Sequence, residues 1–273
     1  MNWLHSLLLR LTGVGLVLAS AMTAVSAEQT TLTASELAAK LSAIRQDGSC
    51  FVRARMQVKD SSGGIKSTLQ LQMKSRAGKE GTELVYQVMW PKEKKGEAVL
   101  LRGAPNRQAS GAIFVPPNAP KALSTGQMKD TLFDSNLTYE DIIENFFAWD
   151  DQTLAGTEII DRAPCQILES KPGKSGRSIY GSVRTWVDMR RMVPMRVEKF
   201  SPSGQLVRRI ETTRVANDDL GRPIPAYLKI SGPREDTITE MDGSKIRHGV
   251  SYTDQEFTPE GLQDMTAPKS APE

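Results

Sequence analysis

Few side chains in this sequence have the types and spacing that enzymatic or metal chemistry requires. The sequence holds two histidines, and His5 lies in the apolar N-terminal segment, which leaves His248 alone. A zinc site needs several histidine, cysteine or carboxylate ligands together, so a lone histidine favours a surface or hydrogen-bonded role. No glycine-rich phosphate loop and no GxSxG nucleophile motif occur in the sequence. We therefore expect no metal, no cofactor and no enzymatic activity.

Three acidic residues lie near one another and imitate a general acid–base pair. They are Asp134, Glu140 and Asp141. Thr138 followed by Asp141 has the form of a capping box, in which each side chain satisfies a backbone donor at a helix start. Acidic residues in the first turn also complement the positive end of the helix dipole. We interpret these acids as a helix cap.

Residues 133–150, with the sequence FDSNLTYEDIIENFFAWD, concentrate aromatic side chains in a chain that is only 6% aromatic. Tyr139, Ile142 and Phe146 recur at helical spacing, which predicts an amphipathic helix that begins after Thr138. Two interpretations remain open for this helix. It either packs on a sheet to complete a core, or it forms a hinged apolar lid over a cavity.

The N-terminal segment 1–27 has the features of a secretory signal peptide. Arg10 precedes an apolar run at 11–22, and Val25, Ser26 and Ala27 form a small-residue cleavage site. The run is shorter than the roughly 20 apolar residues of a membrane helix, and no later segment approaches that length. We expect cleavage after Ala27, export to the periplasm and no integral membrane segment. The formal net charge of +3, without a basic cluster, argues against a nucleic-acid partner.

Cys50 and Cys165 are the two cysteines of the chain. In an oxidising exported compartment an even pair favours a disulfide, and we expect a bridge between them. A loop of this length would stabilise the fold by about 4 kcal/mol in the chain-entropy model. The alternative is two separate buried thiols.

The rest of the chain has the pattern of one further helix and many short strands. Leucines on one face of residues 31–45, followed by Gly48, predict a helix. Alternating apolar and polar residues predict strands at 52–59 and 69–74, and 84–90 is apolar on both faces, as in a strand covered on both sides. Further short strands are predicted at 97–102, 112–115, 158–160, 165–170, 182–188, 195–200, 206–215, 227–231 and 245–253. Turn residues between them indicate a large antiparallel sheet in one domain, 28–266, followed by a disordered tail, 267–273. Two helices are too few to cover one face, so such a sheet either closes on itself or curls around an apolar hollow.

Five short motifs add a resemblance to a known family. They are GAIFVP at 111–116, SNLTYED at 135–141, WVD at 186–188 with MVPMR at 192–196, DDLGRPIP at 218–225 and FTPEGL at 257–262. In this order they resemble motifs of the outer-membrane lipoprotein-sorting (LolA-like) family, in particular its TP-0789-type subgroup. Asn136 stands where the family motif has aspartate. The resemblance implies a mainly β (α+β) fold, an unclosed antiparallel β-barrel of about eleven strands with helices that cover an apolar cavity.

The resemblance also implies a function and a set of site residues. A protein of this kind carries the acyl chains of lipoproteins through the periplasm. In the LolA carrier an arginine at the end of an early strand holds the lid closed, and Arg76 occupies a comparable place, although the following proline of that pattern is missing. We expect Phe146→Asp to abolish acyl-chain binding while the strands stay folded. The side chains expected to line the cavity or its lid are Tyr86, Trp90, Phe114, Leu137, Tyr139, Ile142, Ile143, Phe146, Trp149 and Trp186.

The expected partners are lipoprotein acyl chains or a phospholipid, together with an inner-membrane exporter, for a monomeric protein. One rival hypothesis is an accessory or structural protein of an envelope export complex that binds no lipid. A second rival is an enzyme that uses the same cavity, which the lack of an evident nucleophile or base disfavours.

Overall fold

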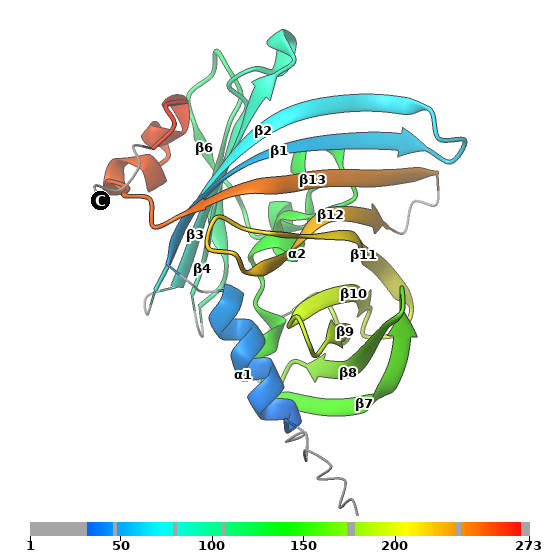
Figure 1. Cartoon of the computed structure of the whole chain (residues 1–273). Helices are drawn as coiled ribbons and strands as arrows, with labels where there is room; N and C mark the ends of the chain where they lie inside the picture. Colours follow the sequence, from blue (N-terminus) through cyan, green and yellow to red (C-terminus); the bar gives the residue numbers. More distant parts are fainter. Residues whose placement is uncertain are drawn as a thin grey trace, which may run out of the picture. The chain divides into compact units, whose positions relative to one another are not determined.

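Thirteen antiparallel strands form a single sheet in the computed structural model of this protein (Figure 1). The structure describes residues 32–45, 48–78, 81–104, 107–173, 178–232 and 236–268. The strands are β1 (Ser49–Asp60), β2 (Ile65–Gly78), β3 (Gly81–Trp90), β4 (Ala98–Gly103), β5 (Ser110–Phe114), β6 (Lys121–Ala122), β7 (Asp151–Ile160), β8 (Ala163–Lys171), β9 (Ser182–Asp188), β10 (Val193–Phe200), β11 (Leu206–Asn217), β12 (Pro223–Ser231) and β13 (Thr237–His248).

The strand order shows that the sheet is open. It runs β6-β5-β4-β3-β2-β1-β13-β12-β11-β10-β9-β8-β7, so β6 and β7 are opposite edges that do not pair with each other. The expected fold class, an unclosed antiparallel sheet with few helices, is therefore confirmed, with thirteen strands in place of about eleven.

Two meanders meet in the middle of this sheet. Strands β1 to β6 lead outward to one edge, and β7 to β13 lead from the other edge back to the centre, where β13 pairs with β1. Residues 123–150, which we call the crossover segment, connect β6 to β7. Because these strands are opposite edges, the segment has to cross the sheet. It contains α2 (Tyr139–Ile143) and three short 3-10 turns, at Gly126–Lys129, Leu132–Asp134 and Phe146–Ala148.

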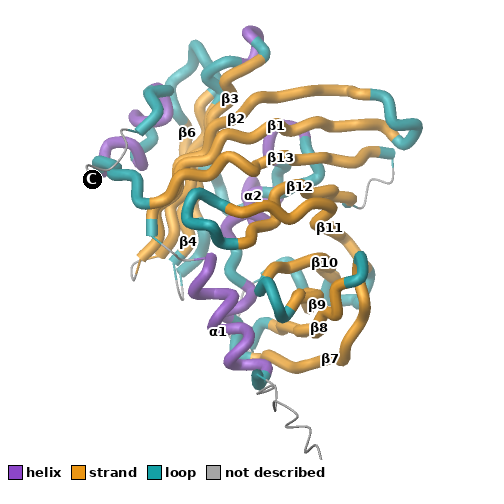
Figure 2. Tube along the Cα trace, in the orientation of Figure 1, coloured by secondary structure: helices purple, strands orange, loops and turns teal. Residues whose placement is uncertain are grey.

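The first helix, α1 (Ala34–Arg45), packs beside β7 and β8 and against the end of the crossover segment (Figure 2). Thr33 caps it, because its hydroxyl oxygen accepts a hydrogen bond from the backbone N–H of Glu36 at 3.3 Å while the Glu36 carboxylate accepts one from the N–H of Thr33 at 2.8 Å. Leu37 and Leu41 are buried in a cluster with Phe146. The helix predicted at 31–45 is thus present, beginning at Ala34.

The two faces of β3 and β4 carry different apolar clusters, as the alternation of side chains along a strand requires. Leu84 and Leu101 face the crossover segment. Val85 and Leu100 face the opposite side, where they are covered by Phe257 and other residues near the C-terminus.

The C-terminal part of the chain differs from the predicted strand at 245–253. Strand β13 ends at His248, and Gly249, with a φ of 63°, turns the chain away from the sheet. Residues 249–268, which we call the C-terminal strap, then cross the outer face with two 3-10 turns, at Asp254–Phe257 and Glu260–Gln263.

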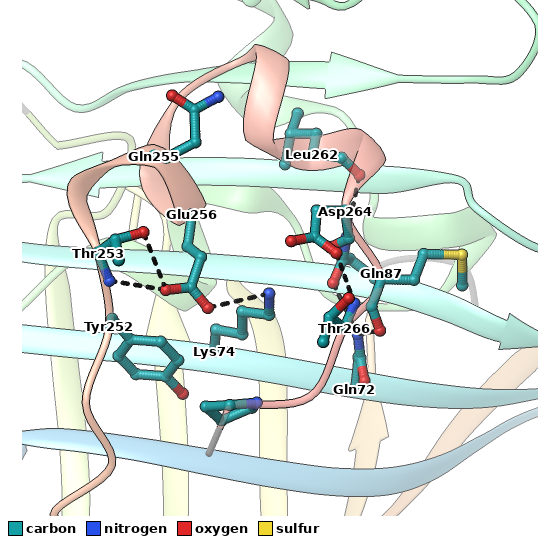
Figure 3. A network of polar contacts seen from close by, with 12 residues as sticks. Gln72, Lys74, Gln87, Tyr252, Thr253, Gln255, Glu256, Leu262, Asp264 and Thr266 are labelled. Atoms are coloured by element: carbon teal, nitrogen blue, oxygen red, sulfur yellow. Dashed lines mark hydrogen bonds and ion pairs between the residues drawn. The ribbon is translucent and has the colours of Figure 1, made fainter.

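A buried polar network holds the strap on β2 and β3 (Figure 3). The amide nitrogen of Gln87 donates to the carbonyl oxygens of Leu262, at 3.0 Å, and Asp264, at 2.9 Å. The amide of Gln72 donates to the carbonyl of Met265 at 2.9 Å. The ammonium of Lys74 lies 3.4 Å from the carboxylate of Glu256. These side chains satisfy strap carbonyls that would otherwise be buried without a donor.

The expected disulfide is not formed. Cys50 lies on β1 and Cys165 on β8, and the structure shows no bridge between them. Five strands separate β1 from β8 in the sheet order, whereas a disulfide needs Cα atoms within about 7 Å of each other. The second alternative, two separate thiols, is the one observed.

Two expectations concern chain ends that lie outside the described residues. They are the signal peptide at 1–27 and most of the tail at 267–273, and both remain predictions. Among the described residues, none of the helices combines the length and apolar character that crossing a membrane would require.

We expect the strap to contribute strongly to stability. Phe257 is 1% exposed, and its ring packs edge-on against Tyr252 at a centroid distance of 5.3 Å. Phe257→Ala should lower the free energy of unfolding by about 3–5 kcal/mol, because it leaves a cavity between the strap and the sheet. Urea unfolding followed by tryptophan fluorescence would measure the change. Leu220→Ala, at a side chain that is 60% exposed, is the control and should shift it by less than about 0.5 kcal/mol.

Candidate functional site

The helix of the crossover segment is shorter than its sequence predicts. The capping box of Thr138 and Asp141 is present, but α2 ends at Ile143 after five residues. Tyr139 and Ile143 pack against β3 and β4, whereas Phe146 packs against α1. The segment leaves the helical path between Ile143 and Phe146 because these two groups of side chains belong to different clusters.

Asp141 is the most tightly held residue of the segment. Its buried carboxylate lies 2.9 Å from the ammonium of Lys199 on β10 and 2.9 Å from the guanidinium of Arg208 on β11. It also accepts hydrogen bonds from the backbone N–H and hydroxyl of Thr138, both at 2.9 Å, and from the hydroxyl of Tyr180 at 2.5 Å. The capping residue therefore also ties α2 to the second half of the sheet.

The electrostatics of Asp141 follow from this geometry. Burial alone would raise the pKa of its carboxyl, but the charges of Lys199 and Arg208 outweigh burial and hold that pKa well below its usual range. The same burial, together with the charge of Asp141, raises the pKa of the Tyr180 hydroxyl. Asp141 is therefore a permanently ionised anchor, which is consistent with its interpretation as a cap and not as a general acid.

Further contacts fix the chain just before α2 and near the end of α2. The side chain of Asn136 exchanges hydrogen bonds with Thr237, at 3.2 Å, and Thr239, at 2.9 Å, both on β13. The guanidinium of Arg45, at the end of α1, donates to the carbonyl oxygen of Ile142. Asn136, which departs from the family motif, thus has a defined structural role.

A half-open cavity of about 830 Å³ lies between the crossover segment, the ends of β3 and β4, and residues just before β9. Both meanders contribute to its wall. Its apolar lining comes from Ala109, Met128, Ile143, Ala148, Trp149 and Ile179. Its charged lining comes from Arg107, Lys129, Glu140, Glu144 and Asp150.

Two polar atoms in the cavity wall lack hydrogen-bond partners among the described residues. They are the Oε2 atom of Glu144 and the Oδ1 atom of Asn145, and both are buried. Burial, aided by the charges of Glu140 and Asp141, raises the pKa of the Glu144 carboxyl to about 7, although a hydrogen bond from Ser178 and the charge of Lys199 act in the opposite direction. The wall therefore contains acceptors that the protein itself leaves unsatisfied.

Seven of the predicted cavity and lid residues lie in or beside the crossover segment, but few of them reach the cavity. Tyr86, Tyr139, Ile142 and Ile143 share the cluster on β3 and β4, and Phe146 and Trp149 share the cluster with α1. Of all the predicted residues, Ile143 and Trp149 line the 830 Å³ cavity.

Phe146 is 4% exposed and surrounded by α1 and β8 to β10, so it belongs to a core. Phe146→Asp would bury a carboxylate in that core. The structure therefore does not support it as a test that leaves the fold intact.

Three of the predicted residues lie elsewhere on the sheet, and a fourth, Leu137, lies in the crossover segment without lining the cavity. Phe114 lies on the outer face under the strap, because residues next to each other in a strand face opposite sides and Ile113 takes the inner position. Trp186 likewise faces away from Val187, which packs against α1, and its indole N–H donates to Glu158 at 2.7 Å. Trp90 is 50% exposed at the end of β3. Leu137 is buried in the turn before α2.

Arg76 does not contact the crossover segment through any ion pair of the described residues. Its guanidinium lies 2.6 Å from the carboxylate of Glu83 and 2.7 Å from that of Asp254, and it covers the ring of Phe257 at 4.5 Å. Arg76, which we expected to hold the lid closed, therefore contacts β3 and the C-terminal strap. The cations that bind the crossover segment are Lys199 and Arg208 at Asp141, Lys94 at Asp134 and Arg45 at the carbonyl of Ile142.

His248 is not isolated, because Asp218 and Asp219 lie beside it within metal-ligand spacing. The hydrogen bonds of this group are, however, internal. Asp219 accepts from the His248 backbone N–H at 2.8 Å and contacts the ring Nδ1 at 2.6 Å, and Asp218 contacts the guanidinium of Arg222 at 2.9 Å. These contacts join the β11–β12 turn to the end of β13, so we assign the group a structural role.

Sequence reasoning missed Lys199 and Arg208. Val197 and Lys199 are two positions apart in β10, so their side chains lie on the same side of the strand. Val197 packs in the inner cluster, which places Lys199 on the inner side as well.

Asp141→Asn should destabilise the protein by about 3–5 kcal/mol, because it leaves two buried cations without their counter-charge. The matched control is Asp254→Asn, whose side chain is 94% exposed and should cost at most about 1 kcal/mol. Chemical unfolding at pH 7 compares the two, and equal losses would contradict the anchor role.

The effect of Asp141→Asn should also depend on pH. Since the folded-state pKa of Asp141 lies below its unfolded value, its contribution is present above the unfolded pKa and is lost as pH falls through the folded pKa. The difference between wild type and Asp141→Asn should therefore shrink in the acid range.

Solved structures of other proteins share this fold. A DUF1329 family protein from Desulfovibrio piger is 22% identical, with a TM-score of 0.77 over 84% of this chain and 98% of the other. A domain named for outer membrane lipoprotein sorting, from Vibrio parahaemolyticus, is 18% identical, with a TM-score of 0.73 over 83% and 97%. A LolA superfamily protein from Nitrosomonas europaea is 22% identical, with a TM-score of 0.66 over 84% and 98%.

Sequence comparisons identify the family of this protein. No curated protein sequence matches the chain. A family model described as "-like: Uncharacterized protein" matches residues 80–264. Because this match covers more than half of the chain, the protein belongs to the uncharacterised family that the model describes, and its fold is that of the LolA superfamily.

Proposed function

We propose that this protein is a non-enzymatic periplasmic carrier that binds the acyl chain of a lipoprotein or lipid. The observation that carries the proposal is the 830 Å³ cavity with its row of apolar side chains on and beside the crossover segment, in a fold shared with lipoprotein-sorting proteins. The cavity volume falls within the roughly 300–1,000 Å³ of typical ligand sites, and its wall combines apolar side chains with polar and charged ones.

Hydrophobic contact is the binding mechanism. Each buried methylene contributes about 0.8 kcal/mol, so an acyl chain gains most of its affinity from length alone. Met128, Ile143, Trp149 and Ile179 offer an apolar path for such a chain. The open side of the cavity allows the chain to enter and leave.

The crossover segment acts in this proposal as a fixed wall. Asp141 is bound to β10 and β11, Asn136 to β13, and the carbonyl of Ile142 to Arg45. A hinged lid would have to break the buried ion pairs of Asp141, each time exposing or isolating a charge. These contacts favour a preformed cavity over a lid that closes on the ligand.

Export by the signal peptide at 1–27 supports a periplasmic location. The chain would receive its cargo from an inner-membrane exporter and act as a monomer.

Trp149→Ala should weaken acyl-chain binding about tenfold. The substitution removes a half-buried indole from the cavity wall, whose apolar contact with the acyl chain would contribute about 1.5–3 kcal/mol to binding. Displacement of a fluorescent fatty acid would measure the affinity. Trp90→Ala is the matched control, since this tryptophan is 50% exposed and does not line the cavity.

Protein purified without detergent and examined by native mass spectrometry tests the function itself. A mass without ligand, combined with no displacement of the fluorescent fatty acid from wild type, would contradict the carrier and favour an accessory protein that binds no lipid.

A further inference from the structure

The longer of the sheet's two free edges is β7. It has ten residues, whereas the opposite edge, β6, has two. Among the described strands β7 pairs with β8 alone, and residues 153–159 are all exposed. Figure 1 shows β7 as the outermost strand of the second meander, with α1 beside its beginning. Alternate residues of such an edge turn an unpaired N–H and C=O outward, which makes the edge a template for a further strand.

Two large apolar side chains are exposed on one side of this edge. Leu154 is 37% exposed and lies opposite Leu168, which packs in the cluster with α1. Ile159 is 73% exposed and faces the same side, because the neighbouring Ile160 packs with Cys165 on the opposite face. The strand contains no lysine or proline, which commonly protect an edge from pairing. The edge therefore offers both main-chain groups and apolar contacts to a further strand.

The beginning of the edge adjoins the 830 Å³ cavity. Trp149 and Asp150 line the cavity, and the next residue, Asp151, is the first of β7. Ala148 and Asp150 are exposed, so the cavity is open at this end. A group attached to an acyl chain in the cavity would therefore emerge beside the first residues of β7. At about 3.3 Å per residue, the edge then extends about 33 Å from the cavity.

The chemistry of the edge fits a polypeptide. Main-chain N–H and C=O groups pair with those of another extended chain, whereas a hydrocarbon chain has neither donors nor acceptors for them. The bulge between Leu154 and Gly156 bends β7 but leaves exposed backbone on both sides of it. An acyl chain and an attached polypeptide would thus find adjoining sites of matching chemistry.

We propose that the free edge of β7 binds an extended polypeptide segment as an added strand, and that this segment is attached to the acyl chain in the cavity. This assignment rests on the proposed carrier function and adds a second contact to it. Main-chain hydrogen bonds give affinity that depends little on sequence, whereas Leu154 and Ile159 favour apolar residues at alternate positions. Such a site accepts many polypeptides and distinguishes an acylated polypeptide from a free lipid.

Two ligands with equal acyl chains test the assignment: dodecanoate and a dodecanoyl octapeptide of alternating valine and serine. Each competes with a fluorescent fatty acid for the wild-type protein. We expect the dodecanoyl peptide to bind at least about tenfold more tightly than dodecanoate, because it adds several main-chain hydrogen bonds.

Two further dodecanoyl peptides have the same side chains and carry N-methyl groups on the backbone, one at the odd and the other at the even positions. In an added strand the N–H groups of alternate residues point to β7. One set of N-methyl groups should therefore lower the affinity about tenfold, and the other should stay within about threefold of the unmethylated peptide. A contact without strand pairing would treat both sets alike.

Ile159→Lys places a charge on the edge, which disfavours pairing with another strand. The variant should weaken binding of the dodecanoyl peptide about fivefold, and it should leave the affinity for dodecanoate within about twofold because Ile159 does not line the cavity. Ile65→Lys, at a side chain that is 60% exposed at the start of β2, is the matched control and should change neither affinity.

The outcomes separate this inference from the function on which it rests. If dodecanoate binds but the dodecanoyl peptide binds no more tightly, or if the two N-methyl sets are equal, the strand site is wrong and the carrier stands. If Ile159→Lys leaves the peptide affinity unchanged and converts a dimer of the free protein into a monomer, the edge pairs with a second copy and the strand site is again wrong. If neither ligand binds to wild type, the carrier proposal fails together with the strand site.

Discussion

A single buried carboxylate ties the crossover segment to the second half of this sheet. Asp141 lies on the segment that links the two open edges, and its partners Lys199 and Arg208 belong to β10 and β11. A buried ion pair is stabilising only when its geometry and hydrogen bonds are complete. Here Thr138 and Tyr180 complete them. The position of α2, and with it the shape of the cavity wall, depends on this one charge cluster.

The two faces of β2 to β5 serve different purposes. The outer face is sealed by the C-terminal strap, whose backbone carbonyls accept hydrogen bonds from Gln72 and Gln87 and whose Glu256 carboxylate pairs with Lys74. The inner face receives the crossover segment and leaves a hollow beside it. Because the strap satisfies its polar groups from side chains of the sheet, it is part of the fold. The crossover segment, by contrast, leaves acceptors at Glu144 and Asn145 open.

The sequence predicted what depends on local periodicity and missed what depends on contacts between distant residues. The strands, the first helix and the capping box of Thr138 and Asp141 follow from spacing alone. The side of the sheet that Phe114 faces depends on strand register, which a shift of one residue reverses. The end of α2 at Ile143 depends on the different clusters that Ile143 and Phe146 join. Likewise, the assumption that an even pair of cysteines is bridged failed because β1 and β8 are not neighbours.

The meeting of β1 with β13 in the middle of the sheet has a consequence for how the chain folds. Each meander consists of hairpins whose partners are close in sequence, so their loops close at small entropic cost. The central pair joins Cys50 to His248 and closes the longest loop among the sheet's strand pairs. Pairing over such a separation is intrinsically slow. Since both meanders contribute to the cavity, the cavity exists only in chains that have completed this central pairing, and a ligand that fills it would report on complete folding.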